Sequence, residues 1–233
     1  MNMRWIIGLF FFGCVAAQQV WAETSLGLPV EGVQTIVLRN EVGKNQIQFV
    51  SSAPLEEIHG TASEISGALK LDPANVEGMT GKIEVQVASM ETGIEKRDAH
   101  LHSADWLDEK QFPVIVFEIA GLKDVSVETG EDRAFIKGLA MGTFSLHGMD
   151  KEMEIPFEAT YLLASEQTKK RAPGDFFVVK GEFEIALKDF DIAGARGLVG
   201  NRVGKKIDLQ TNFFGSTHPK RAYEMDVDTP SPP

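Results

Sequence analysis

The chain has 233 residues, of which 43% are hydrophobic and 24% charged, with a formal net charge of −11 at pH 7. This acidic balance argues against nucleic acid or an anionic membrane surface as a partner, because the composition provides no basic footprint. The single cysteine, Cys14, lies in the first segment. The rest of the chain therefore contains no disulfide and no cysteine nucleophile.

Residues 1–22 have the pattern of a secretory signal peptide. Arg4 supplies a positive charge, residues 5–17 are an almost unbroken apolar run, and Val20-Trp21-Ala22 fits a signal-peptidase site. The run is too short for a transmembrane helix, which needs about 20 apolar residues. We expect cleavage after Ala22 and export to the periplasm. Lipoprotein processing at Cys14 is the less favoured alternative, because the usual upstream Leu is missing.

Alternation of polar and apolar residues predicts β-strands along the rest of the chain. The alternating segments are 46–49, 82–87, 182–185 and 206–210. Residues 113–119 and 176–179 are more evenly apolar, which is typical of strands covered on both faces. Further strands are expected at 34–39, 58–71, 134–146 and 152–162.

Turn-forming residues separate these segments at 72–75, Gly121, 129–132, 148–150 and 173–175. Short strands with such turns, and no long helices between them, predict an all-β fold, either a closed antiparallel barrel or a sandwich. Pro156 indicates an edge or a bulge in its strand. Residues 218–233 combine charges with Pro-Ser-Pro-Pro and are expected to be a disordered tail, which leaves 23–217 as one domain.

The polar stretch TGIEKRDAHLHSADWLD, residues 92–108, predicts a short helix inserted between strands. Thr92 and Glu95 have the spacing of a capping box, in which the Thr caps the helix and the Glu reaches back to it. Helical spacing then places Ile94 and Leu101 on the face toward the barrel.

The two histidines in this stretch, His100 and His102, form a His-x-His pattern. On a strand both imidazoles would share a face and could bind a metal, whereas on a helix they lie about 200° apart. The helical interpretation therefore argues against a metal site. His59 and His147 each precede a glycine and are expected to have structural roles.

No sequence motif supports catalysis. A nucleophile elbow, an HExxH helix and a glycine-rich phosphate loop are all missing from the sequence. Asp105 and Asp108 would serve as acid–base groups only if they lined a cleft. We therefore assign no catalytic residue. A small hydrolase or isomerase using residues 92–108, and a secreted protein-interaction module, are the alternatives to a binding protein.

The apolar faces of the strands predict the interior of the barrel. A barrel of about eight strands is either filled by side chains or left open for one ligand, and the sequence leaves both alternatives open. With 15 Phe and only 2 Tyr, the aromatic surface carries few polar groups, which suits an aliphatic ligand. The residues expected to line the interior are Ile47, Phe49, Ile83, Val85, Val87, Ile115, Phe117, Phe183, Ile185, Ile207 and Leu209.

The polar stretch and its continuation resemble the signature of the YceI-like polyisoprenoid-binding family. The family pattern is Thr-Gly, then Arg-Asp-x-His-Leu-Arg-Ser-x-Asp-Phe-Phe-Asp, then Tyr-Pro-x-Ile-x-Phe. It corresponds here to residues 92–93, 97–108 and 112–117, and weaker agreement extends the similarity over about 33–214. The signature positions in the polar stretch include Thr92, Arg97, Asp98, His100 and Asp105, which match, and Trp106, where a larger aromatic replaces the usual Phe. His102 replaces the usual Arg, which leaves the headgroup preference open.

The resemblance implies an eight-stranded antiparallel, lipocalin-like barrel with a short helical insertion. It implies that the interior holds an isoprenoid, an isoprenoid quinone or a similar amphiphilic lipid, and that the protein carries or sequesters this ligand without catalysis. Arg97, Asp98 and His100 would hold the helical insertion against one end of the barrel. No other cofactor and no membrane span are expected, and the sequence leaves homodimerisation open.

Overall fold

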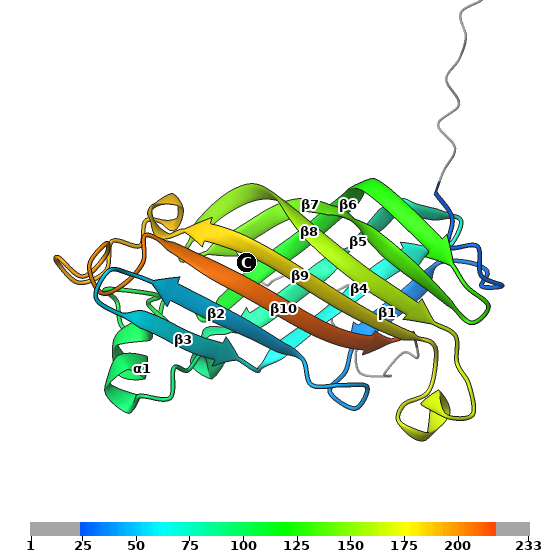
Figure 1. Cartoon of the computed structure of the whole chain (residues 1–233), viewed down its shortest axis with the longest axis horizontal. Helices are drawn as coiled ribbons and strands as arrows, with labels where there is room; N and C mark the ends of the chain where they lie inside the picture. The colour runs from blue at the N-terminus through cyan, green and yellow to red at the C-terminus, as the bar shows by residue number, and fades with distance from the viewer. Residues whose placement is uncertain (1–23, 218–233) are drawn as a thin grey trace, which may run out of the picture.

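The structure, a computed structural model, describes residues 24–217. The expected signal peptide at 1–22 and the expected tail at 218–233 lie outside the described residues. Within residues 24–217, ten strands form one antiparallel sheet, accompanied by a single short α-helix (Figure 1).

Eight of these strands close into a barrel, because β1 pairs with β4 on one edge and with β10 on the other. In order around the barrel they are β1 (Gln34–Leu38), β4 (Ile65–Asp72), β5 (Asn75–Gln86), β6 (Val114–Thr129), β7 (Arg133–Leu146), β8 (Met149–Leu162), β9 (Phe176–Ala186) and β10 (Lys206–Ser216). The eight-stranded antiparallel barrel expected from the family resemblance is thus confirmed.

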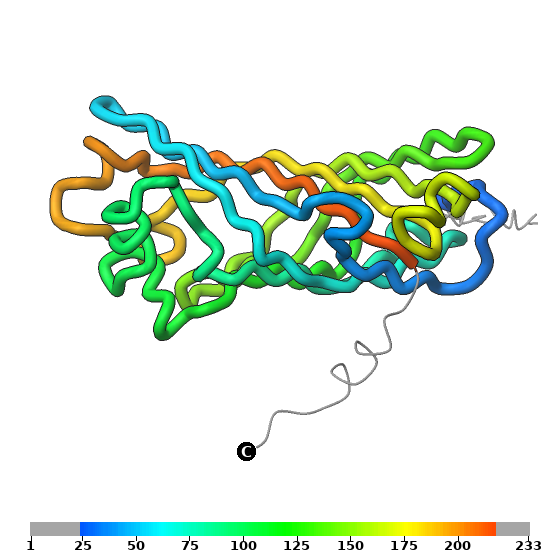
Figure 2. The backbone as a smooth tube through the Cα atoms, turned by 90° about the horizontal axis from the view of Figure 1, so that it is seen from below, coloured from blue at the N-terminus to red at the C-terminus, as the bar shows by residue number. Residues whose placement is uncertain are grey.

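The other two strands form a hairpin beside the barrel. β2 (Gln46–Ser52) pairs with residues 208–212 of β10, and β3 (Glu57–Ala62) pairs with β2. β1 pairs with β10 only at residues 215–216, so β10 has two successive neighbours on the same edge. In Figure 2 the hairpin runs alongside β10 toward the end of the barrel that carries α1 (Glu95–Leu101).

Short 3₁₀ segments lie at both ends of the barrel. η1 (Val87–Ser89) and η3 (Leu187–Phe190) follow β5 and β9 at the end with α1, and η2 (Thr168–Lys170) lies in the β8–β9 loop at the opposite end (Figure 1). We call the end with α1 the mouth and the opposite end the closed end.

Several strand boundaries differ from the sequence prediction. Residues 58–71 form two strands, β3 and β4, while 176–179 and 182–185 belong to the single strand β9. Gly121 was predicted to end a strand, and this is wrong: β6 continues through it with a shift in register after Ile119. Such a bulge inserts one extra residue into the strand. The next buried large side chain after Ile119 is therefore that of Leu122, three residues further on instead of two.

Pro156 does mark a local edge, as expected. β8 pairs with β9 only from Phe157 to Leu162, and from Met149 to Pro156 it pairs with β7 alone. Proline has no N–H to donate to a neighbouring strand. β8 and β9 therefore separate in the half of the barrel near the mouth.

The closed end is filled by side chains. Residues 24–30 fold across it: the Leu26 N–H donates to the Pro73 carbonyl at 2.8 Å, and the Thr129 hydroxyl donates to the Leu26 carbonyl at 2.7 Å. The Leu26 side chain is fully buried. It joins the inward residues of this half in one apolar cluster: Ile36, Leu71, Val76, Leu122, Ala134, Ile136, Ala159, Tyr161 and Phe177. This packing closes one end of the barrel.

Candidate binding cavity

The half of the barrel near the mouth encloses a cavity of about 470 Å³. Its wall is formed by inward side chains of the barrel and of β2, and it ends at the packed residues of the closed end. Ten of the eleven residues expected to line the interior lie in this wall: Ile47, Phe49, Ile83, Val85, Ile115, Phe117, Phe183, Ile185, Ile207 and Leu209. The eleventh, Val87, lies outside the wall, because β5 ends at Gln86 and Val87 begins η1, where its side chain packs in the core.

The sequence analysis missed other residues of the wall. The additional apolar ones include Leu38, Leu69, Ala140, Phe157, Val179 and Phe213. All but Phe213 hold inward positions of predicted strands, where the polar–apolar alternation is weaker. Phe213 lies in the part of β10 beyond the predicted segment 206–210. Phe144 is central among the missed residues: its ring centroid lies 6.3 Å from that of Phe117, 6.1 Å from Phe183 and 5.6 Å from Phe190.

Two hydroxyl side chains reach the cavity from the barrel wall, and both already have partners. Ser51 Oγ accepts a hydrogen bond from the Gly204 N–H at 2.8 Å, and Thr211 Oγ1 donates to the Gly181 carbonyl at 3.2 Å. A polar ligand group would therefore find little compensation for its lost hydration deep in the cavity. The interior favours an apolar chain.

Charged residues of the wall are confined to the mouth: Glu56, Lys96, Arg97, His100 and Arg202. Arg97 connects the helix to the β2–β3 turn, since its Nη1 lies 3.1 Å from Glu56 Oε1. Arg202 Nη1 lies 3.9 Å from Glu56 Oε2. The three side chains thus join α1, the β2–β3 turn and the loop of residues 187–205 around the opening.

The capping box predicted for Thr92 and Glu95 is wrong. The helix begins two residues later than a Thr92 cap requires: Ile94 is its N-cap residue and makes no side-chain cap. Gly93 has a φ of 76°, a left-handed conformation that suits glycine and separates Thr92 from the helix. The Thr92 hydroxyl instead donates to Asp98 Oδ1 and accepts from Arg97 Nε at 2.8 Å.

Asp98 is the centre of this small network. Its Oδ1 also accepts the Thr92 backbone N–H at 2.7 Å. Partial burial acts to raise the pKa of Asp98, but the hydrogen bonds from Thr92 and the positive charge of Arg97 outweigh it and hold the pKa below the ordinary value. Asp98 is therefore an ionised residue that fixes the loop before α1.

The histidines of the polar stretch have different surroundings. His100 is exposed at the mouth, whereas His102 Nε2 lies 2.8 Å from the Met90 carbonyl and its Nδ1 lies 3.2 Å from Glu109 Oε2. Within residues 24–217 no three His, Cys, Asp or Glu side chains are placed together to hold a metal ion. The other two histidines of residues 24–217 also have partners: His59 Nε2 lies 2.7 Å from Glu57 Oε1, and His147 Nδ1 lies 3.1 Å from the Phe190 carbonyl.

The remaining residues of the polar stretch lie beside the opening. Trp106 lines the cavity and packs on Gly194, where an added Cβ would lie 2.5 Å from the indole ring. Glycine at this position thus allows the 187–205 loop to rest on the Trp106 ring. Asp105 is exposed, and neither Asp105 nor Asp108 is part of the cavity wall.

A closed eight-stranded antiparallel barrel with an apolar cavity inside it defines a lipocalin-like fold. The YceI-like domain family matches residues 41–213. The chain belongs to this family.

Individual relatives are distant. A UPF0312 protein of Azotobacter vinelandii is 32% identical over 153 residues, which cover 66% of this chain and 73% of the relative. A UPF0312 protein of Pseudomonas putida strain W619 is 30% identical over 137 residues, 59% of this chain and 65% of the relative, slightly less than two thirds of its length.

Solved structures share the fold. Burkholderia cenocepacia BcnA has a TM-score of 0.56 at 17% identity, covering 74% of this chain and 97% of that one. A polyisoprenoid binding domain from Saccharophagus degradans has a TM-score of 0.55 at 13% identity, covering 80% and 100%. In the described part of this chain, no helix is long and apolar enough to cross a membrane.

Proposed function

We propose that this protein binds one long apolar lipid, an isoprenoid, an isoprenoid quinone or a similar amphiphile, and carries or sequesters it. The cavity carries the proposal, because its volume of about 470 Å³ falls in the usual range for small-molecule sites and its deep wall is apolar. Each methylene removed from water contributes about 0.8 kcal/mol, so affinity grows with the length of chain that enters. The name of the Saccharophagus degradans neighbour agrees with this ligand class.

Export supports the same proposal. Residues 1–22 have the pattern of a secretory signal peptide, which would place the mature barrel, residues 23–217, in the periplasm. A water-insoluble chain needs a protein enclosure to cross an aqueous compartment. The proposed role is binding, and no residue of the cavity is assigned to catalysis.

Mass spectrometry of an organic extract tests the ligand. The protein is produced with residues 1–22 intact and purified without detergent. We expect a co-purified hydrophobic compound in stoichiometric amount. A protein that is empty and also takes up no isoprenoid alcohol or quinone from solution would overturn the proposal.

A pair of variants on one strand tests the site. Ala140 lies in the cavity wall, whereas the adjacent Met141 points to the outer face of β7. Ala140→Phe fills the cavity and should abolish lipid uptake, and Met141→Phe adds a ring outside the barrel and should leave uptake unchanged. Equal uptake by both variants would show that the lipid binds elsewhere.

A further inference from the structure

Exposed apolar side chains mark the mouth of the barrel. Leu55, in the β2–β3 turn, is 72% exposed, and Ile94, just before α1, is 53% exposed. The Leu55 N–H donates to the Asn201 carbonyl at 3.1 Å, so the backbone of the turn is fixed while the side chain faces solvent. Ile94 also borders the cavity. Leu55 is the neighbour of Glu56, and Ile94 precedes Arg97 by three residues, so the Arg97–Glu56 ion pair brings the two exposed side chains to the same rim.

The rim carries both cations and carboxylates: Lys96 follows Glu95 in α1, and Arg202 Nη1 lies 3.9 Å from Glu56 Oε2. Lys96 and Arg202 border the cavity opening and are exposed. The 187–205 loop contributes further exposed Lys and Arg side chains, Lys188, Arg196 and Lys205, against two aspartates. One of these, Asp189, faces Lys151 at 3.8 Å. In a chain with a net charge of −11, this loop is a local exception.

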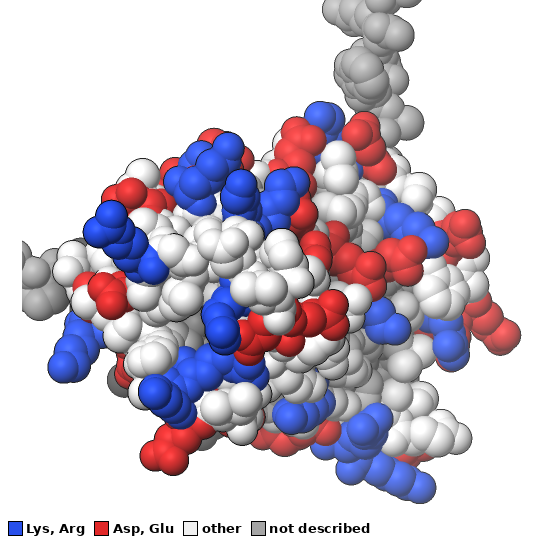
Figure 3. Space-filling view, turned by 60° about the vertical axis from the view of Figure 1, so that its left-hand side comes forward, with Lys and Arg blue, Asp and Glu red and all other residues white. Residues whose placement is uncertain are grey.

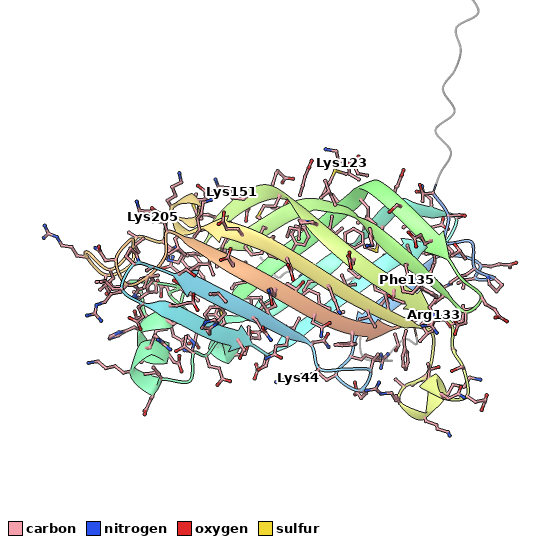
Figure 4. All side chains as sticks on the ribbon, viewed as in Figure 1. Lys44, Lys123, Arg133, Phe135, Lys151 and Lys205 are labelled. Carbon is pink, nitrogen blue, oxygen red and sulfur yellow. The ribbon has the colours of Figure 1, made fainter. Side chains whose placement is uncertain are left out.

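The figures show the same distribution. Lys and Arg side chains are spread over the mouth end, among Asp and Glu side chains and uncharged surface (Figure 3). Lys205 extends into solvent at this end, whereas Phe135 and Arg133 lie at the closed end (Figure 4). The sequence analysis argued against an anionic membrane surface from the net charge of the whole chain, and this net charge does not describe the local charge around the mouth.

We propose that the rim of the mouth docks on an anionic phospholipid bilayer. We define this rim by Leu55, Ile94, Lys96 and Arg202. Apolar side chains enter the boundary between headgroups and acyl chains, while nearby Lys and Arg are attracted to anionic headgroups. The rim combines both features: Leu55 and Ile94 supply exposed apolar side chains, and Lys96 and Arg202 supply positive charge beside the opening.

Docking by the rim places the cavity opening against the bilayer. A lipid could then pass between the membrane and the apolar wall without crossing bulk water, which avoids the cost of hydrating its whole chain. This consequence rests on the proposed lipid-binding function. The docking surface itself depends only on the exposed rim residues.

Vesicle co-sedimentation tests the docking surface. The mature protein is mixed with vesicles of phosphatidylcholine alone or with 30% phosphatidylglycerol. We expect binding to the anionic vesicles that weakens as salt is raised, because exposed charges are screened. Replacing two cations, Lys96→Gln with Arg202→Gln, should weaken binding about 25-fold, since each cation near an anionic surface contributes roughly fivefold.

Matched variants at the closed end provide the control. Lys169→Gln with Lys170→Gln removes two exposed cations from the β8–β9 loop and should leave vesicle binding unchanged. Leu55→Ser with Ile94→Ser should reduce binding, while Val33→Ser with Phe135→Ser, also exposed, should not. Thermal unfolding checks that every variant is folded.

The proposal is overturned if the wild-type protein does not bind anionic vesicles, binds neutral ones equally well, or loses affinity equally with the control variants. Lipid extraction separates it from the proposed function. A protein that carries lipid but ignores vesicles contradicts docking alone, and one that docks but never holds lipid contradicts the proposed function alone.

Discussion

The two halves of the barrel are built from the same strands and differ in what fills them. On β9, Phe177 is fully packed at the closed end, while Phe183, six residues along the same face, borders the cavity. The closed end receives additional apolar side chains from residues 24–30, whereas the mouth stays open and carries both apolar and charged side chains around its opening. Close packing and open space are thus divided between the two ends of one sheet.

The largest expected effect is a loss of stability on replacing Phe177, measured against the same replacement at Phe183. Phe177→Ala removes a ring that packs against Tyr161 at a centroid distance of 6.3 Å, and should reduce the free energy of unfolding by about 3–5 kcal/mol. Phe183→Ala enlarges an existing space and should cost about 1–2 kcal/mol, mainly lost partial burial. Urea unfolding measures both values. Equal losses would contradict the division of the barrel into a packed and a hollow half.

The next effect concerns a hydrogen bond at the closed end, between Tyr161 of β8 and Asp175, the residue before β9. The Tyr161 hydroxyl donates to Asp175 Oδ2 at 2.7 Å, and burial together with this hydrogen bond raises the pKa of Tyr161, so the hydroxyl stays protonated. Tyr161→Phe should reduce the free energy of unfolding by about 1.5–3 kcal/mol, the usual cost of a hydrogen bond to a charged group. Lipid uptake should stay normal, and a loss of uptake would indicate that the two ends are coupled.

A pH-dependent effect is expected at the mouth. The lowered pKa of Asp98 means that its ionised form stabilises the fold. This contribution is complete above the pKa of an unfolded Asp, about 3.9, and is lost as pH falls through the lower folded value. Asp98→Asn should lower the free energy of unfolding by about 1 kcal/mol at pH 7, and the difference from wild type should shrink in acid. A difference that is the same at pH 7 and pH 3 would exclude this role.

The smallest effect is expected for His100. Its side chain is exposed at the mouth, so His100→Ala should change the free energy of unfolding by less than about 0.5 kcal/mol. Lipid uptake should also be unchanged. A hydrolase or isomerase using residues 92–108 would instead lose turnover while remaining folded. Activity assays of His100→Ala and Asp98→Asn therefore distinguish a binding protein from an enzyme with its active site in this loop.

Much of the cavity could be predicted from alternation alone, because inward positions recur every second residue along a strand. The division of the barrel interior into a packed half and a hollow half could not be predicted in this way. Ala134 and Ala140 occupy equivalent inward positions on β7, yet one is packed and the other borders empty space. What separates them is a tertiary contact, the folding of residues 24–30 over the closed end, which leaves no period in the sequence.

Contacts with neighbouring parts of the chain explain the wrong predictions at Thr92 and Gly121. In a capping box the Thr92 hydroxyl would accept a backbone N–H of the helix. The left-handed turn at Gly93 separates Thr92 from the helix, and the hydroxyl donates to Asp98 instead. At Gly121 the sequence shows a strand breaker, but strand pairing on both sides carries the chain through as a bulge. Both outcomes depend on neighbours that a single segment does not reveal.

The separation of β8 from β9 has a mechanical consequence. From Phe157 to Leu162 the two strands are paired, so widening the closed half would break their ladder. From Met149 to Pro156, β8 has no such pairs with β9 to lose. The girth of the hollow half can therefore change along this seam without disrupting a β8–β9 pair, so the width of the barrel is less constrained by backbone pairing near the mouth than at the closed end.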